Sequence, residues 1–90
     1  MTTDEWFASI EERFRRARRT PFFRLGPTDW KLIERWRLSG IPLELIRRGI
    51  DRTFAAWRNK PRYAQIERPN SLAYCARAVE QEARALGTRV

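Results

Sequence analysis

The sequence contains no histidine and only one cysteine, Cys75. Without histidine, the usual proton carrier of neutral-pH catalysis is missing, and one cysteine can form neither an internal disulfide nor most of a zinc site. We therefore predict a protein that is not an enzyme and that binds no metal or other cofactor. Cys75 lies three residues after Leu72 and four before Val79, a spacing that predicts a buried core residue.

Long hydrophobic runs are also absent. No apolar stretch approaches the roughly 18–20 residues needed to cross a bilayer. The first twelve residues include the acidic side chains Asp4, Glu5, Glu11 and Glu12, whereas transit peptides are poor in acids. We expect a cytoplasmic protein with no integral membrane association, and the lone thiol fits a reducing compartment.

Signals for β-strands are missing as well, because the β-branched residues are few and never alternate with polar ones. Apolar residues instead recur at spacings of three and four, and Pro and Gly interrupt the pattern. The pattern predicts one compact all-α domain over residues 1–90, with four helices at about 4–19, 27–39, 42–58 and 70–86. We expect the helices at 27–39 and 42–58 to form a central antiparallel pair that the other two cover.

Three positions carry more specific structural expectations. Asp29 falls in the first turn of the second helix, where its carboxylate can accept backbone N–H groups. Gly49 lies inside the third helix, where glycine costs up to about 1 kcal/mol relative to alanine. We therefore expect another backbone to approach Gly49 closely. Asn70 or Ser71 is the expected cap of the fourth helix.

The chain is strongly basic, with 19 Lys and Arg residues against 11 Asp and Glu, a formal net charge of +8. The densest concentration is Arg13, Arg15, Arg16, Arg18 and Arg19 near the end of the first helix. On a continuous helix Arg15, Arg18 and Arg19 would share one face and attract phosphate groups. The alternative is a solvated helix end whose arginines pair with Glu11 and Glu12.

A second basic segment follows the third helix. It contains Arg58, Lys60, Arg62 and Tyr63, with Arg68 further on. Cations interleaved with an aromatic ring are typical of proteins that hold single strands, because the cations follow the phosphates and the ring stacks on a base. The alternative is a flexible polar connection with Tyr63 turned inward.

Residues 25–80 contain a series of motifs. The first is Trp30-Lys31-Leu32-Ile33-Glu34-Arg35-Trp36, and the second is Gly40-Ile41-Pro42-Leu43-Glu44-Leu45-Ile46, continued by Ile50 and Phe54. The third is Tyr74 followed by Ala78-Val79. This order resembles the C-terminal helical domain of the DnaD-like family of bacterial and phage primosome proteins. The resemblance implies a helical fold and a role in DNA replication through contacts with DNA and other replication proteins.

Other functional patterns are less favoured. The third helix follows a short corner and carries Arg47, Arg48 and Arg52, which suggests a helix-turn-helix, but Pro42 and Glu44 occupy the end that would read bases. Cys75 has no histidine to activate it as a nucleophile. Glu80 and Glu82, two residues apart on a helix, diverge and cannot share a ligand.

The sequence therefore favours a small basic, non-catalytic module that binds nucleic acid or assists DNA replication. Its predicted contacts are Arg13, Arg15, Arg16, Arg18, Arg19, Arg58, Lys60, Arg62 and Tyr63. The alternative is an adaptor that docks on an acidic protein partner through the same arginines or an exposed aromatic among Trp6, Phe7, Phe22 and Phe23. A third hypothesis places the amphipathic first helix on a membrane surface or a partner.

Overall fold

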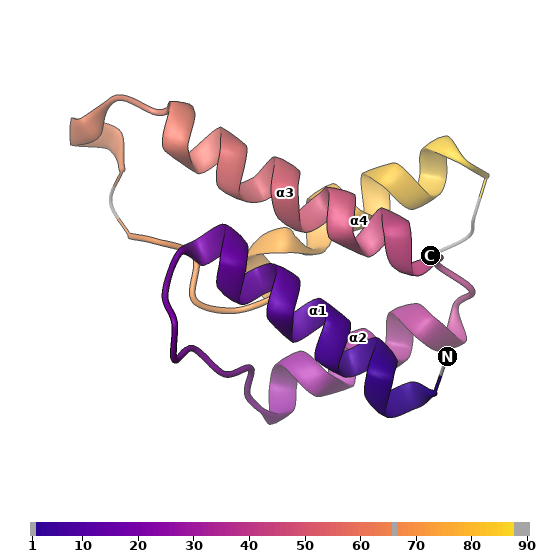
Figure 1. The fold of residues 1–90 in the computed structure, drawn as a ribbon. Helices are drawn as coiled ribbons and strands as arrows, with labels where there is room; N and C mark the ends of the chain where they lie inside the picture. Colours follow the sequence, from indigo (N-terminus) through magenta and orange to yellow (C-terminus); the bar gives the residue numbers. More distant parts are fainter. Residues whose placement is uncertain (1, 66, 88–90) are drawn as a thin grey trace.

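The structure is a computed structural model that describes residues 2–65 and 67–87. Over these residues the chain forms four α-helices, one 3₁₀ turn and no strand. The elements are α1 (Thr3–Arg18), α2 (Pro27–Leu38), α3 (Leu43–Asn59), η1 (Arg62–Ala64) and α4 (Ala73–Ala85). The prediction of an all-α domain with four helices is confirmed, and the helix ends lie within a few residues of those expected (Figure 1).

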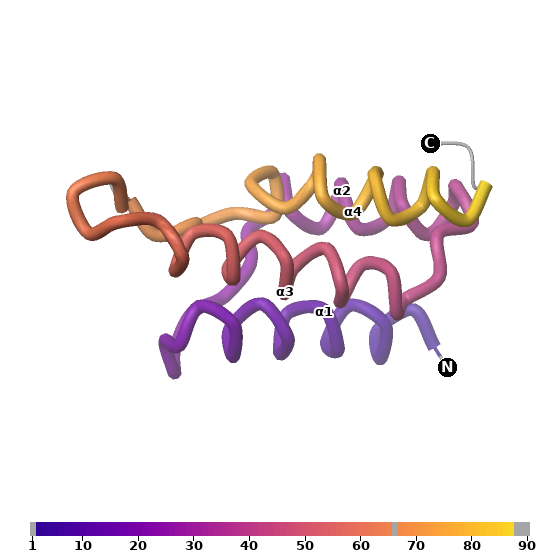
Figure 2. Tube along the Cα trace, turned by 90° about the horizontal axis from the view of Figure 1, so that it is seen from above, coloured from indigo at the N-terminus to yellow at the C-terminus, as the bar shows by residue number. Residues whose placement is uncertain are grey.

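Helix α3 lies at the centre of the molecule. Figures 1 and 2 show that α1 and α3 run in the same direction, while α2 and α4 run the opposite way. The most extensive helix–helix packing is between α3 and α4, followed by that between α1 and α3. We expected α2 to be the principal neighbour of α3 in a central pair. This expectation was wrong, because the principal neighbour of α3 is α4.

Gly49 explains why α4 can pack so closely on α3. A Cβ atom placed at Gly49 would lie only 2.7 Å from the Cα atom of Val79 and 2.7 Å from its backbone nitrogen. Only a residue without a side chain allows the two helix backbones to come this near. The expectation of a close backbone approach at Gly49 is confirmed, and α4 supplies the approaching backbone.

The core draws on all four helices, including the first. Phe14 of α1 is fully buried, with its ring centroid 5.3 Å from that of Phe54 in α3 and 5.1 Å from that of Phe23. Phe7 of α1 lies against Trp30 of α2 at 5.2 Å. The apolar face of α1 is therefore used for packing, which removes the support for a free amphipathic helix.

The fourth helix starts differently from the prediction. Its N-cap is Leu72, and neither Asn70 nor Ser71 caps it through a side chain. Asp29, which is buried, takes this role instead. Its Oδ1 accepts the Leu72 N–H at 2.9 Å, and its Oδ2 accepts the Gly26 N–H at 2.8 Å.

Candidate nucleic-acid interface

One end of the molecule gathers basic side chains from three separate segments. Because α1 and α3 run in parallel, both end on the same side of the molecule, and the η1 segment projects beyond the end of α3 (Figures 1 and 2). Arg58 of α3 donates to the Ala17 carbonyl of α1, and Arg68 donates to the Arg18 carbonyl at 3.2 Å. We call this surface the basic end, and it consists of Arg18, Arg19, Arg58, Lys60, Arg62 and Arg68.

Three positive charges of the basic end, those of Arg19, Arg58 and Arg68, are close enough to influence one another. The pKa of Arg58 is lowered, first because burial disfavours the charged form and second because Arg19 and Arg68 repel it. Among the described residues, no carboxylate forms an ion pair with any member of the basic end. The basic end is therefore a concentration of positive charge without local neutralisation.

Some arginines of the basic end also hold the fold together. The carbonyls capped by Arg58 and Arg68 belong to the last turn of α1, where helix carbonyls lack partners within the helix. The Arg18 guanidinium donates to the Pro69 carbonyl at 2.9 Å and to the Thr20 hydroxyl at 3.0 Å. It also lies 4.6 Å from the centre of the Phe23 ring. Arg19 and Arg62, by contrast, are exposed.

The remaining arginines of α1 have carboxylate partners. Arg13 pairs with Asp51 of α3 at 3.2 Å, Arg16 pairs with Glu12 at 2.9 Å, and Arg15 also contacts Glu12. The sequence alternative of pairing within the helix thus applies to Arg15 and Arg16. These ion pairs reduce the net positive charge of the arginine run on α1.

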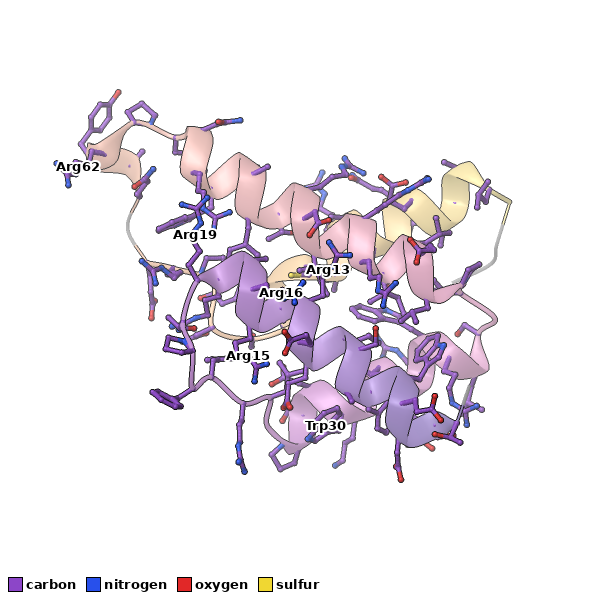
Figure 3. The ribbon with its side chains drawn as sticks, in the orientation of Figure 1. Arg13, Arg15, Arg16, Arg19, Trp30 and Arg62 are labelled. Carbon is purple, nitrogen blue, oxygen red and sulfur yellow. The ribbon has the colours of Figure 1, made fainter. Side chains whose placement is uncertain are left out.

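The expected shared face of Arg15, Arg18 and Arg19 does not form. Arg19 follows the last helical residue and adopts the left-handed conformation, with φ of 60°, so helical spacing no longer determines its direction. Figure 3 shows Arg13 and Arg19 on the side of α1 towards α3, and Arg15 on the side away from it. Only the end of the arginine run therefore contributes to the basic end.

The segment after α3 is folded back on the helix and presents Tyr63 outward. The Gln65 amide donates to the carbonyls of Arg58 at 3.0 Å and Lys60 at 2.9 Å. Tyr63 is 89% exposed, so the alternative of an inward-turned ring is wrong. An exposed ring directly after Arg62, with Lys60 three residues before it, matches the composition expected of a surface that contacts nucleic acid.

Sequence reasoning missed a groove between α3 and α4. One wall is Thr53, Ala56 and Trp57 of α3 with Lys60 directly after the helix, and the other wall is Tyr74, Arg77, Ala78 and Gln81 of α4. Both sets have the spacing i, i+3, i+4, i+7, which marks one face of a helix. The groove has a volume of about 580 Å³ and opens beside the basic end, with which it shares Lys60. This spacing in the sequence could have indicated two helix faces of similar character, but only the tertiary structure shows that the two faces lie opposite each other.

The structure also argues against the helix-turn-helix hypothesis. Helix α3 is enclosed by α1 and α4 and buries much of its own length, including Leu45, Ile46, Ile50 and Phe54. Two of its arginines are engaged: Arg47 with Glu44 at 2.7 Å, and Arg52 with Glu82 at 3.0 Å. The exposed face of α3 also carries Glu44 and Asp51 beside Arg48, and these carboxylates would meet phosphates of their own charge in a major groove.

Cys75 is a core residue, as predicted. It is fully buried, and burial raises the pKa of its thiol from 9.0 to about 12. Asp29 adds to this rise, while a hydrogen bond with Thr53 opposes it. The thiol therefore stays protonated at neutral pH, which is the state of an unreactive structural cysteine.

The part of the chain that the structure describes contains neither a metal-binding cluster nor a membrane-spanning helix. No group of three or more cysteine, aspartate or glutamate side chains gathers there in a way that could hold a metal ion. None of the described helices has the length and apolar character of a membrane span.

Comparison with known proteins places the chain in a family. No curated protein matches it, and no solved structure does. A family model described as "Uncharacterised protein" matches residues 5–89, which is most of the chain. The chain therefore belongs to the protein family that carries this description.

Proposed function

We propose that the protein is a non-catalytic nucleic-acid-binding module that contacts phosphate groups through its basic end. The observation that carries the proposal is the meeting of Arg19, Arg58 and Arg68, which come from three segments of the chain and have no carboxylate partner among the described residues. The α1 carbonyls that Arg58 and Arg68 contact offset part of the repulsion among these cations, and nearby anions would stabilise the arrangement further. The phosphates of a nucleic acid supply such anions and release counterions when they bind.

The roles of the individual residues follow from their contacts. The side chains of Arg19, Lys60 and Arg62 are exposed and can reach phosphates. Arg58 and Arg68 each use part of the guanidinium to donate to an α1 carbonyl, so only their remaining N–H groups can contact a phosphate. Arg18 keeps the loops in place. Arg13, Arg15 and Arg16 contribute less, because Asp51 and Glu12 already compensate their charges.

The proposal is tested by titrating fluorescently labelled single-stranded and duplex DNA and RNA with the protein across a salt series. We expect binding at about 50 mM salt that weakens with salt, with a log–log slope of about three to five. Replacing Arg19, Lys60 and Arg62 together by serine should reduce affinity at least tenfold and lower the slope by about two to three.

A matched control removes the same charge from the opposite end of the molecule. Arg35, Arg37 and Arg84 are exposed and lie on α2 and α4. Their joint replacement by serine should change affinity less than threefold. Absence of binding at about 50 mM salt, or equal losses in the two triple variants, would overturn the proposal.

The biological setting that we propose is DNA replication, which depends on the resemblance of residues 25–80 to the DnaD-like family. Preference for DNA over RNA in the same titrations supports this setting, and preference for RNA contradicts it. Bacterial two-hybrid assays against the proteins of the replication machinery test the implied protein contacts directly.

One observation favours the adaptor as a second candidate function. Phe22 is 93% exposed, on the connection between α1 and α2, while its neighbour Phe23 is packed on Phe14. An isolated exposed aromatic residue is a common anchor for a protein partner. If Phe22→Ser leaves nucleic-acid binding unchanged but abolishes co-purification of a specific partner, the adaptor function is supported.

A further inference from the structure

We propose that the groove between α3 and α4 holds an unpaired nucleobase, so that the protein prefers single strands to duplexes. This inference rests on the proposed function, which supplies the phosphate contacts. It adds a second site with different chemistry, since the basic end attracts any polyanion whereas the groove selects for a flat ring with free faces.

The groove exists because its walls are small where the two helices face each other. Ala56 on α3 and Ala78 on α4 lie in the middle of the two facing stripes and leave the space open. Ala64 and Pro69 of the connecting segment close the groove at the η1 end. Its volume, about 580 Å³, falls in the range of sites that hold a small organic group.

Two aromatic side chains line this space. Tyr74 is a helical residue that remains 51% exposed, so its ring offers a surface for stacking. Trp57 is held in position by Arg68, whose guanidinium carbon lies 5.7 Å from the indole ring. Aromatic rings beside cations are the usual platform for unpaired bases, since every base has two π faces. In a duplex those faces are covered by neighbouring base pairs.

The charges around the groove fit a nucleotide. Lys60 and Arg77 lie on opposite walls, and neither forms an ion pair with a carboxylate within the described ranges. Arg52 is already engaged with Glu82 at 3.0 Å and Gln81 at 3.4 Å, and Glu67 is the one acidic residue of the lining. Because Lys60 belongs also to the basic end, a strand that binds there can place its next base in the groove.

The experiment compares three labelled probes. The first is a 12-nucleotide thymidine strand, the second is the same strand in which the middle nucleotide of each successive group of three lacks its base (the abasic strand), and the third is a 12-base-pair duplex. For the unchanged protein, we expect the thymidine strand to bind about tenfold more tightly than the abasic strand. Tyr74→Ala should remove this difference and leave duplex binding within twofold, whereas Tyr74→Phe, which keeps the ring, should behave like the original.

Phe22→Ala is the matched control, because it removes an exposed aromatic ring far along the chain from the groove; it should preserve the difference between the strands. Circular dichroism of each variant checks that the helices persist. If Tyr74→Ala weakens all three probes equally, or none, the inference about the groove is wrong while the proposed function stands. If no probe binds the unchanged protein, the proposed function itself fails.

An acidic peptide is the other chemistry that a cationic, aromatic groove could accept. A labelled 12-residue peptide of alternating glutamate and tryptophan tests it. Binding of this peptide that Tyr74→Ala abolishes, combined with no discrimination between the thymidine and abasic strands, would overturn the nucleobase assignment. Discrimination between the strands without peptide binding supports it.

Discussion

Asp29 joins the beginnings of α2 and α4, although Leu72 at the start of α4 lies 43 positions after Asp29 in the chain. Its Oδ2 accepts the N–H of Gly26 at the start of α2, and its Oδ1 accepts the N–H of Leu72 at the start of α4. One buried carboxylate thus satisfies two backbone groups and fixes the approach of α4 to α2.

Asp29→Asn should destabilise the fold, because an amide has one oxygen and can replace only one of the two acceptors. A buried N–H left without a partner costs about 1–3 kcal/mol, and urea unfolding followed by circular dichroism measures the loss. Asp51→Asn is the control: it removes an exposed carboxylate that pairs with Arg13 and should cost less than about 1 kcal/mol. Equal losses in the two variants would contradict the role of Asp29.

Gly49→Ala should also destabilise the protein, although alanine has the higher helix propensity by about 1 kcal/mol. The added Cβ would lie 2.7 Å from the Val79 backbone, so α4 must move away, at a cost of about 1–3 kcal/mol. Adding Val79→Ala should restore part of the stability at most, because the backbone contact remains. A rise in the midpoint of thermal unfolding in Gly49→Ala would show that the helices are not so close.

The Cys75 thiol should make stability fall at high pH. Since burial raises its pKa from 9.0 to about 12, the unfolded chain loses the proton first, and stability declines as the pH rises above 9. The contribution lost by pH 10 is about 1.4 kcal/mol. Urea unfolding at pH 8 and pH 10 should show a larger loss in the original protein than in Cys75→Ala, and parallel losses would refute the assignment.

Phe22 and Phe23 are adjacent but should respond differently to mutation. Phe22 is 93% exposed, so Phe22→Ala should change the free energy of unfolding by less than about 0.5 kcal/mol. The Phe23 ring lies 5.1 Å from Phe14 and under the Arg18 guanidinium, and Phe23→Ala should cost about 2–3 kcal/mol. Denaturant midpoints of the two variants provide the comparison; similar midpoints would contradict the packing of Phe23 on Phe14.

Much of the helical architecture was accessible from the sequence, because its causes are local. Pro27 and Gly40 mark the limits of α2, and the apolar spacing from Ile46 to Phe54 predicts the buried face of α3. Glycine inside a helix likewise predicted the close approach at Gly49, though not the identity of its neighbour. The start of α4 was misplaced because its cap, Asp29, comes from a distant part of the chain.

The candidate site was only partly predictable. Arg58 and Arg19 do come together at the basic end, whereas Arg62 lies further out on η1 (Figure 3). Arg13 reaches Asp51 instead, a partner 38 residues away. The groove with Tyr74 and Trp57 was missed, since it requires two helix faces to oppose each other.

The sequence by itself determined the helices, their apolar faces and the excess of positive charge, because these depend on neighbours within about one helical turn and on composition. Only the tertiary structure decided which charges remain without a partner. That outcome depends on the parallel course of α1 and α3, which brings distant side chains together and places some arginines beside carboxylates and others beside one another.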